Sequence, residues 1–329
     1  MSYKILENKT TADFTMTSVY VDHLKALMAK NPAVMELESD LGGSLLGAPA
    51  MKDIREKFPK QLINCGIQEA NMISVAAGLS LMGRIPFAHS FAAFVSRRAT
   101  DQAFISGAYA GSNVRIIGTD PGVSAQLNGG THMPFEDVAI FRAFPKMTVI
   151  EPSDPVMLGN IIDQVADLYG MFYIRLFRKN ALKIYEEGST FEIGKAATLR
   201  EGRDLTIITA GAVMMPEVLK AADELSKEGI EARILDMFTI KPIDADAILA
   251  AASETGAIVT AENHNIINGL GSAVAEVVTT RGTSFTPIEM VGVTDRFGQV
   301  GPLAYLKEAY HLTAADIVAA AKRAIERKG

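Results

Sequence analysis

The sequence predicts an α/β fold of two domains, each built on a parallel or mixed sheet. Short apolar runs typical of strands alternate with helix-like segments along most of the 329 residues. Repeated strand–helix pairs imply a parallel sheet that is covered by helices on both faces. The length suffices for two domains of ordinary size, and a polar, glycine-containing stretch at residues 179–204 divides the pattern into two units.

The first unit opens with a helix and then alternates strands with helices. A short strand leads into Glu69, and an apolar run rich in small residues follows and stops at Gly83. The remaining strands are short apolar runs that end at polar or glycine-containing loops. The predicted helices span residues 18–30, 72–81, 94–108 and 155–168, and the predicted strands span 33–38, 61–64, 85–88, 114–118, 147–150 and 172–176.

The second unit repeats this alternation on a smaller scale. Its predicted strands span residues 205–211, 231–235, 257–261 and 288–292, and its predicted helices span 217–227, 245–253, 271–280 and 314–328. We place the first domain at residues 1–185, a linker at 186–203 and the second domain at 204–329.

The composition excludes several classes of function. A net charge of −6 argues against a nucleic-acid-binding surface, which normally shows a basic balance. The single cysteine, Cys65, excludes an internal disulfide and a cysteine-built metal site, and fits a reducing compartment. The N-terminus lacks a signal-peptide pattern, and no apolar run reaches membrane-spanning length. We therefore expect a cytoplasmic protein that binds neither nucleic acid nor membrane.

Glu69 is the first candidate for chemistry. It follows a predicted strand and precedes a predicted helix, and ligands usually bind at such strand-to-helix switches in open α/β sheets. A buried carboxyl group there would exchange a proton with a bound ligand. The alternative is a glutamate that only interacts favourably with the helix dipole.

Phe91 and Phe94 are the second candidate. They lie three residues apart in the stretch His89–Phe94, so on a helical turn they would share a face. Two phenylalanines at this spacing are usually core residues. The alternative is an aromatic slot for a flat heterocycle.

The third candidate is the long loop at residues 119–134. Long loops without structure of their own are uncommon in compact domains and are usually functional or disordered. This loop carries several polar side chains, too many for a buried connection unless it surrounds a ligand. Its His132 could satisfy a loop carbonyl, or it could serve as a general acid/base or hydroxyl donor near neutral pH.

Other common motifs are missing from the sequence. There is no Walker-type phosphate loop. Residues 269–271 resemble part of a dinucleotide-binding fingerprint, but the third glycine position is Val274 and no suitable acid follows. The histidines show no metal-ligand spacing, so we expect no metal site in this chain; they are His23, His89, His132, His264 and His311.

Several ordered segments resemble the C-terminal half of a transketolase, over roughly residues 15–324. They read CGIQEANM, HSFAAFVSRRATDQ, NGGTHMPFEDVAIFRAFP, VIEPSDP, IRLFRKN and GVTDRFGQVG. The resemblance implies a pyrimidine-binding domain followed by a transketolase C-terminal domain. The Gly-Asp-Gly…Asn motif that holds Mg²⁺ and the cofactor diphosphate in this family does not occur here. The chain thus resembles one subunit of a split transketolase.

The resemblance also implies a cofactor and the residues that bind it. Glu69 matches the glutamate that hydrogen-bonds the pyrimidine ring of thiamine diphosphate and shares a proton with it, and the cofactor carries the difficult carbanion chemistry. Phe91 and Phe94 match the aromatic pocket around the pyrimidine. Asp40 and Ile67 match positions beside the cofactor.

Further matches fall on the substrate side. Ser44, His132 and Arg178 match positions that contact the sugar, with Arg178 at its phosphate, and an arginine fork suits that group. On the same grounds Glu69 and His132 are the implied catalytic residues.

The sequence departs from the family pattern around the substrate. Arg97 replaces a pocket aromatic, and we expect it to contact substrate. Asn128 replaces an aspartate that reads substrate hydroxyls, and Asp120 replaces a histidine. Thr17-Ser18 stands in the place of a phosphate-binding Thr-Arg pair. These exchanges weaken the case for an ordinary pentose phosphate substrate, and the sequence identifies neither the donor nor the acceptor sugar.

The resemblance implies a thiamine-diphosphate-dependent transketolase subunit that transfers a two-carbon ketol unit from a ketose to an aldose. It implies a partner subunit that carries the diphosphate and a Mg²⁺ or Ca²⁺ ion, in an α₂β₂ assembly. Two alternatives stay open. One is a related reaction, as in a deoxyxylulose-phosphate synthase or the β subunit of a 2-oxo acid dehydrogenase. The other is a non-catalytic binding subunit of the same fold.

Overall fold

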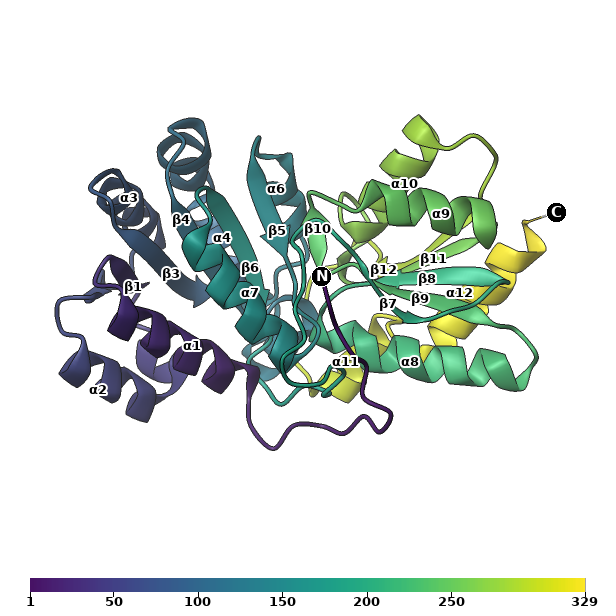
Figure 1. Cartoon of the computed structure of the whole chain (residues 1–329), viewed down its shortest axis with the longest axis horizontal. Helices are drawn as coiled ribbons and strands as arrows, with labels where there is room; N and C mark the ends of the chain where they lie inside the picture. Colours follow the sequence, from purple (N-terminus) through teal and green to yellow (C-terminus); the bar gives the residue numbers. More distant parts are fainter. Residues whose placement is uncertain (329) are drawn as a thin grey trace.

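The computed structural model describes residues 1–328, and within them the strands form a seven-stranded and a five-stranded sheet. The two sheets lie in adjacent lobes, the first formed mainly by the first half of the chain and the second by the second half (Figure 1). Both sheets are mainly parallel with one antiparallel edge strand. The predicted fold class of two α/β units is confirmed.

The first sheet contains a strand from the second half of the chain. From edge to edge its strands are β2 (Leu62–Asn64), β1 (Val34–Glu38), β3 (Ile85–Phe91), β4 (Val114–Thr119), β6 (Met171–Leu176), β5 (Met147–Ile150) and β10 (Thr239–Lys241). The strands from β2 to β5 pair in parallel. In contrast, β10 pairs antiparallel with β5.

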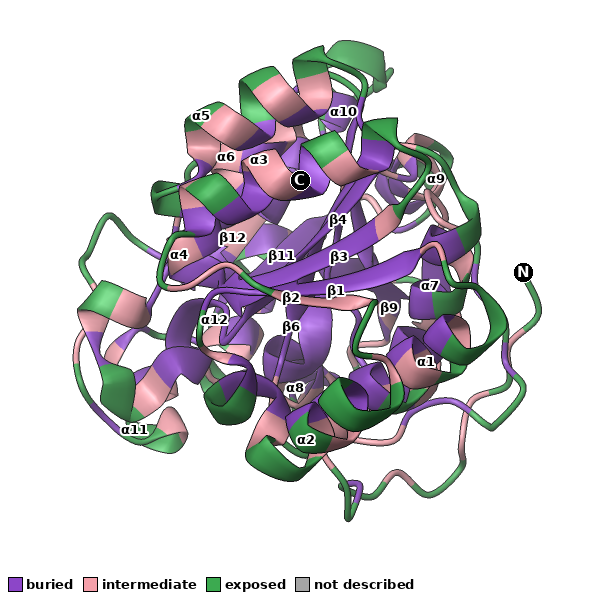
Figure 2. Cartoon of the chain, turned by 90° about the vertical axis from the view of Figure 1, so that its left-hand side faces the viewer, coloured by how far each residue is buried: buried purple, intermediate pink, exposed green. Residues whose placement is uncertain are grey.

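Helices cover both faces of this sheet. On one face α1 (Met16–Lys30) packs against α7 (Pro155–Asp167), and α2 (Ala48–Lys57) lies nearby. On the other face α3 (Glu69–Leu81), α4 (Ala92–Arg97) and α6 (Asp137–Ala143) contact the strands. The central strands are therefore buried on both sides, as Figure 2 shows, which explains their continuous apolar runs.

The second sheet is smaller and is built on the same plan. Its strands in order are β7 (Ala197–Arg200), β9 (Ala232–Asp236), β8 (Leu205–Thr209), β11 (Ile258–Asn265) and β12 (Ile288–Val293). Helices α8 (Gly211–Lys227) and α12 (Ala314–Glu326) cover one face, and α9 (Ala245–Glu254) and α10 (Leu270–Arg281) cover the other. Helix α11 (Leu303–Ala309) contacts a 3₁₀ turn of the first unit, η3 (Gly122–Asn128).

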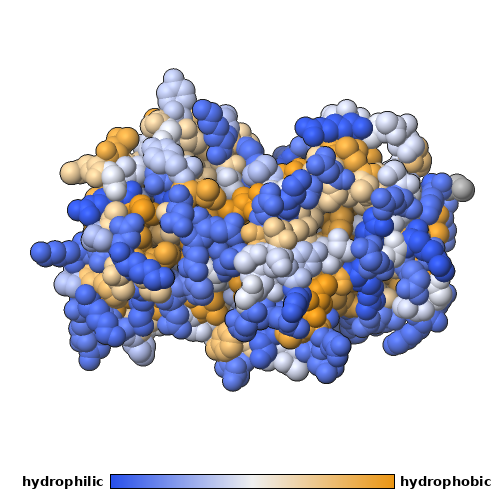
Figure 3. All heavy atoms as spheres, viewed as in Figure 1, coloured by the Kyte–Doolittle hydropathy of each residue, from blue (hydrophilic) through white to orange (hydrophobic). Residues whose placement is uncertain are grey.

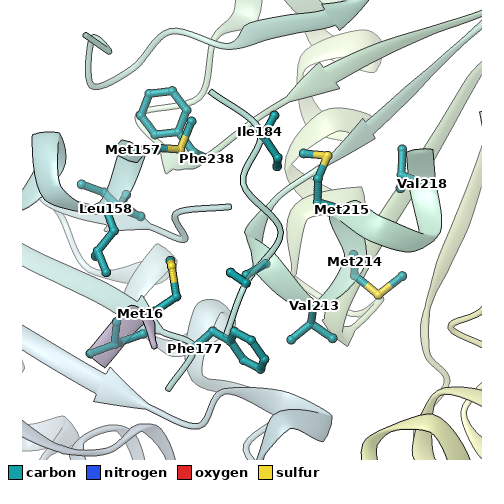
Figure 4. Close-up of a cluster of buried hydrophobic side chains, with 14 of the residues drawn as sticks. Met16, Met157, Leu158, Phe177, Ile184, Val213, Met214, Met215, Val218 and Phe238 are labelled. Carbon is teal, nitrogen blue, oxygen red and sulfur yellow. The ribbon is translucent and has the colours of Figure 1, made fainter. Parts of the chain in front are cut away.

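A continuous hydrophobic core joins the two lobes. In Figure 4 the side chains of Met16 and Met157 from the first lobe gather with Met214 and Phe238 from the second. Ile184, from the connecting segment, is part of the same cluster and is fully buried. Contiguous buried apolar contacts of this kind make up a shared core. The two lobes are therefore packed against each other.

The segment that joins the two lobes, residues 179–204, is held at several places. Isolated bridges pair the N-terminal segment with the connection: Ser2 with Thr190, Ile5 with Tyr185 and Thr11 with Leu182. Strand β7 lies inside the predicted linker and joins the second sheet. The proposed domain boundaries, 1–185, 186–203 and 204–329, stay a prediction.

The structure agrees with the predicted elements apart from local differences. The predicted helix at 94–108 is wrong as a single helix, because α4 is followed by the short α5 (Thr100–Gln102) and a π-helical turn, η2 (Ala103–Tyr109). The predicted strand at 85–88 continues to Phe91 as β3. The sequence did not predict α2, α6, α11, β7 or β10.

The outer surface is mostly polar. Figure 3 shows one face of the molecule, on which hydrophilic residues surround smaller apolar patches. Among residues 1–328, no helix is long and apolar enough to cross a membrane.

Candidate active site

The predicted site residues gather at one edge of the first sheet, where its parallel strands end. Asp40 follows β1, Glu69 follows β2, Phe91 ends β3, Asp120 follows β4 and Arg178 follows β6. Ligands of open α/β sheets bind at this carboxyl edge. Residues distant in sequence therefore meet because the strands that precede them run in the same direction.

Glu69 is a deeply buried acid at this edge. It stands at the first position of α3, and its side chain is 1% exposed. The hydroxyl of Ser90 donates a hydrogen bond to its Oε1 at 3.3 Å, and that hydroxyl accepts one from Ser39 at 2.9 Å. The carboxylate is thus fixed from the sheet side, while its other side faces a cavity.

Arg98 is a site residue that the sequence reasoning missed. Its Nη1 donates to both carboxylate oxygens of Glu69, at 3.2 and 3.0 Å. Its guanidinium carbon lies 3.9 Å from the ring centroid of Phe94, a cation–π contact. Its side chain is 48% exposed, so the ion pair is open on one side. The only sequence signal was its place in the pair Arg97-Arg98, one helical turn after Phe94.

Glu69 and Arg98 line a cavity of about 420 Å³ together with residues of the α3 N-terminus, including Ile67. Ile67 is 69% exposed and stands at its rim. A buried carboxylate at the wall of an open cavity has the arrangement needed to exchange a proton with a ligand.

Phe91 and Phe94 are in contact, but they do not share a helical turn as expected. Phe91 is the last residue of β3, and Phe94 is in the first turn of α4. Their ring centroids are 5.3 Å apart with nearly perpendicular rings. The change from strand to helix between them brings the rings edge to face, an arrangement that aromatic pairs favour.

His132 completes the aromatic cluster. Its ring centroid lies 4.9 Å from that of Phe91 and 4.8 Å from that of Phe94. Its Nδ1 is within hydrogen-bond distance, 2.9 Å, of the Thr131 hydroxyl. Burial and the positive charges of Arg98 and Arg97 lower the pKa of His132 below its ordinary value of 6.5. The lowered pKa favours the neutral imidazole, which can accept a proton on one ring nitrogen and donate a hydrogen bond from the other.

This arrangement makes the titration of His132 a direct test of the site's electrostatics. In the full chain we expect the His132 imidazole to titrate below 6.5. In Arg98→Gln we expect its pKa to rise partway toward 6.5, because removal of a nearby cation favours the protonated ring. The measurement is an NMR pH titration of the ring C–H signal, assigned with a His132→Gln variant.

The matched control is Arg281→Gln, which removes an exposed arginine from α10. It should leave the His132 titration unchanged. An Arg98→Gln variant that also leaves it unchanged would contradict the placement of Arg98 beside this ring.

The loop at residues 119–134 contains short turns that the sequence did not predict. They are two 3₁₀ turns, η3 (Gly122–Asn128) and η4 (Gly130–His132). Residues 121–125 are buried, and Asp120 and Gln126 have positive φ angles of 54° and 50°. Non-glycine residues adopt this left-handed conformation only where the surroundings impose it.

Three predicted substrate residues line a second cavity. Asp120, Asn128 and Arg178 border a polar space of about 180 Å³ together with Lys179. Arg178 donates from Nε to Asp120 Oδ2 at 2.6 Å and from Nη1 to the backbone oxygen of Ser44 at 2.8 Å. Ser44 thus contributes its carbonyl to the arrangement, and its side chain is exposed.

Asp120 limits the positive charge of this cavity. Its burial raises the pKa of its carboxyl group, while Arg178 beside it acts in the opposite direction. The ion pair compensates much of the Arg178 charge. Neither Thr17 nor Ser18 replaces the lost cation, since their hydroxyl groups donate to the backbone oxygens of Arg178 and Thr15.

Two predicted residues lie at the margins of the site. Asp40 is exposed, has a φ of 59° and accepts a hydrogen bond from Asn64 at 3.1 Å. Arg97 turns away from the second cavity: it pairs with Glu136 and donates to the backbone oxygens of Thr131 and Met133 at 3.1 Å each. Its guanidinium therefore holds the backbone on both sides of His132, and contact with substrate stays a prediction.

Phe91 lies between the Phe94–His132 cluster and Arg178. Its ring contacts His132 and Phe94, and the guanidinium carbon of Arg178 lies 5.7 Å from its centroid. Along this edge of the sheet the buried acid Glu69 comes first. The aromatic pair with His132 follows, and then Arg178, which is paired with an acid. This order suits a heteroaromatic ligand next to a polar, elongated second molecule. In the described part of the chain, no group of three or more His, Cys, Asp or Glu residues could hold a metal ion.

Comparison with known families and proteins identifies relatives over nearly the whole chain. The family described as "Transketolase, pyrimidine binding domain" matches residues 12–183, and "Transketolase, C-terminal domain" matches residues 194–317. The "6-deoxy-6-sulfo-D-fructose transketolase subunit SqwH" of Clostridium sp. (strain MSTE9) is 48% identical over 313 residues, 95% of each chain. An apulose-4-phosphate transketolase subunit of Phocaeicola vulgatus is 34% identical and covers 84% of this chain and 86% of its own length.

Solved structures agree with this relationship. A chain titled "Split gene transketolase, inactive beta4 tetramer" superposes with a TM-score of 0.86 at 37% identity, and the match covers 97% of this chain and all of that one. The transketolase from Leishmania mexicana superposes with a TM-score of 0.77 at 23% identity, and the match covers 98% of this chain and 47% of that one. The second comparison shows the fold alone.

Proposed function

This chain belongs to the transketolase family as a C-terminal subunit of the split type, and we propose that it works as half of a thiamine-diphosphate-dependent ketol transferase. The observation that carries the proposal is the buried Glu69 carboxylate at the wall of an open cavity, beside the Phe91–Phe94 pair. A buried acid and an aromatic wall fit the aminopyrimidine end of that cofactor.

Each residue of the site has a role in this proposal. When bound, thiamine diphosphate supplies the stabilised carbanion that two-carbon transfer requires. Glu69 shares a proton with the pyrimidine ring, and Ser90 orients its carboxylate. The neutral imidazole of His132 donates a hydrogen bond to a sugar oxygen or accepts a proton from it. Phe91 and Phe94 form the wall that excludes water from the reacting atoms.

We propose that a partner subunit supplies the diphosphate site with its Mg²⁺ or Ca²⁺ ion, and that the working assembly is α₂β₂. Relatives at 48% and 34% identity are named as transketolase subunits, and a structural neighbour is titled an inactive β₄ tetramer. These three names support a chain that is incomplete as an enzyme. The cytoplasmic location expected from the sequence stays a prediction.

The test of the function is reconstitution. The chain is mixed with a transketolase N-terminal-type subunit, thiamine diphosphate and Mg²⁺, and a ketose donor and an aldose acceptor are added. A product two carbons longer than the acceptor is the expected result. A complex that forms and binds cofactor without producing it would support a non-catalytic subunit.

We further propose that the sugar end bound near Arg178 carries one negative charge, as a sulfonate does. Asp120 compensates much of the Arg178 charge, and the exposed Lys179 is the other cation at this cavity. A phosphate monoester carries close to two charges at pH 7, so it would face the Asp120 carboxylate with less compensation. The names of two relatives represent the two possibilities, a sulfonated fructose and a sugar phosphate.

Asp120→Asn tests this preference in the reconstituted enzyme. It keeps an oxygen that accepts from Arg178 and tolerates the positive φ of this position, while it removes the negative charge. We expect the ratio of kcat/KM for fructose 6-phosphate to kcat/KM for 6-deoxy-6-sulfofructose to rise roughly tenfold. The measurement is a pair of initial-rate series with a common aldose acceptor.

Asp295→Asn is the matched control, because Asp295 also has a positive φ, 48°, but lies outside the Arg178 cavity. It should leave the ratio unchanged. An Asp120→Asn enzyme with the wild-type ratio would show that charge balance at Arg178 does not select the substrate.

A further inference from the structure

The second lobe holds the loop at residues 119–134 through one buried side chain. Asn263, on β11, is fully buried. Its Oδ1 accepts a hydrogen bond from the backbone N–H of Val123 at 2.8 Å, and its Nδ2 donates to the backbone oxygen of Pro121 at 2.8 Å. The amide therefore pairs with the backbone oxygen of the residue before Gly122 and with the backbone N–H of the residue after it, at the start of the loop.

Gly122 is adapted to this contact. Its φ is 54°, and a Cβ built at this position would lie 2.2 Å from Asn263 Oδ1 and 2.4 Å from the Asn263 backbone oxygen. A side chain at residue 122 would displace Asn263. Because Gly122 has no side chain, the loop backbone can lie directly against β11.

Asn263 is itself held by the first lobe. Arg175, on β6, is fully buried and donates from Nη2 to the Asn263 backbone oxygen at 3.0 Å. The same guanidinium pairs with Asp137 at 2.8 Å and with Glu151 at 2.7 Å. A buried charge whose hydrogen bonds are satisfied in this way is a rigid anchor. The position of β11 relative to the first sheet is therefore fixed at Asn263.

The end of the loop is held by the second lobe as well. A Cβ on Gly130 would lie 2.4 Å from the backbone oxygen of Gly298, so the two backbones are in close contact. The backbone N–H of Asn265 donates to the oxygen of Phe135 at 3.1 Å. The loop between these attachments carries Asn128 and His132.

We infer that the second lobe acts as a clamp on the loop at residues 119–134, and that Asn263 is the residue that positions this loop. Positive φ angles at Asp120 and Gln126 must be imposed by the surroundings, and the Asn263 amide acts between them. Without it, the buried Val123 N–H would lose its partner, and the Pro121 oxygen would keep only the hydrogen bonds from the Ser124 hydroxyl and N–H. Asn263 thereby sets the place of Asp120 next to Arg178. The catalytic meaning of this clamp rests on the proposed function, whereas the clamp itself does not.

Hydrogen exchange on the full-length chain tests the clamp without any activity. In Asn263→Ala we expect the backbone amides of residues 122–132 to exchange on the order of 10- to 100-fold faster than in the wild type, because the two buried hydrogen bonds are lost. The amides of α1 and α7 in the same sample should keep their wild-type rates. Mass spectrometry of peptic fragments measures both.

Asn113→Ala is the matched control. Asn113 is also a buried asparagine whose amide oxygen accepts from a backbone N–H, that of Gly170 at 3.0 Å, but it precedes β4 and lies at the opposite edge of the sheet. It should leave the exchange of residues 122–132 unchanged. Asn263→Asp keeps the acceptor for Val123 and removes the donor to Pro121, so it should give an intermediate rate. This variant also provides the test if Asn263→Ala fails to fold.

Kinetics of the reconstituted complex give the second readout. We expect Asn263→Ala to raise KM for the donor sugar on the order of tenfold, while the affinity for thiamine diphosphate stays at the wild-type value. A merely structural role would lower the fraction of active enzyme and leave KM unchanged.

The outcomes separate the two proposals. Wild-type exchange of residues 122–132 in Asn263→Ala or, where that variant does not fold, in Asn263→Asp would overturn the clamp, whatever the activity. Faster exchange confined to this loop supports it, even if the wild-type complex proves inactive and the proposed function fails.

Discussion

Glu69→Gln is expected to reduce ketol transfer by the reconstituted enzyme on the order of 10²- to 10⁴-fold. Glutamine is nearly isosteric and still offers an oxygen to Ser90 and Arg98, so the local structure should persist. It cannot share a proton with a pyrimidine nitrogen, which is the role assigned to this residue. The expected pattern is a loss in kcat with unchanged far-UV circular dichroism and melting temperature.

Glu217→Gln is the control for a change at a paired glutamate. Glu217, on α8, is partly buried and pairs with Lys307 at 2.6 Å, in the second lobe. It should retain full activity. Near-wild-type activity of Glu69→Gln would instead mean that Glu69 only interacts with the helix dipole of α3 and the guanidinium of Arg98.

The isolated chain is expected to turn over at least about 1,000-fold more slowly than the reconstituted complex, because catalysis depends on a cofactor held in one orientation. Sites for ligands of this size bury most of the ligand surface. The cavity at Glu69 is open and is lined by residues of the α3 N-terminus and Arg98. Calorimetry should therefore detect weak binding of thiamine diphosphate to the chain alone.

Addition of an N-terminal-type subunit should restore both turnover and tight cofactor binding. The same subunit should also bind to the Glu69→Gln chain, but it should not restore activity. Stoichiometric turnover by the isolated wild-type chain would refute the proposal that the active site is shared between subunits.

The sequence was sufficient for the sheet strands other than β7 and β10, and for the edge at which the site is built. Central parallel strands are buried on both faces, so they appear as continuous apolar runs, and the residues that follow such strands meet at one edge. For this reason the amino-acid pattern is enough to place Glu69 and the polar loop at this edge, whereas Asp120 and Arg178 were named as site residues only by the resemblance to transketolases.

Other features depend on contacts between residues that are far apart in the chain. Arg98 is exposed and was not singled out, because its importance comes from Glu69 on another helix. Asn263 follows the predicted strand at 257–261 and was not singled out, since its partners are 140 and 142 residues away. The expected helical pairing of Phe91 with Phe94 was wrong because pairing with β4 extends β3 through Phe91.

Strand β10 shows why the two lobes cannot be treated as exchangeable modules. It lies in the second half of the chain, yet its antiparallel pairing protects the β5 edge of the first sheet. A first domain produced alone would leave β5 with unpaired N–H and C=O groups, the feature from which edge-to-edge aggregation starts. Any chimera that combines the cofactor half of one relative with the C-terminal half of another must therefore match this strand pair as well as the lobe surfaces.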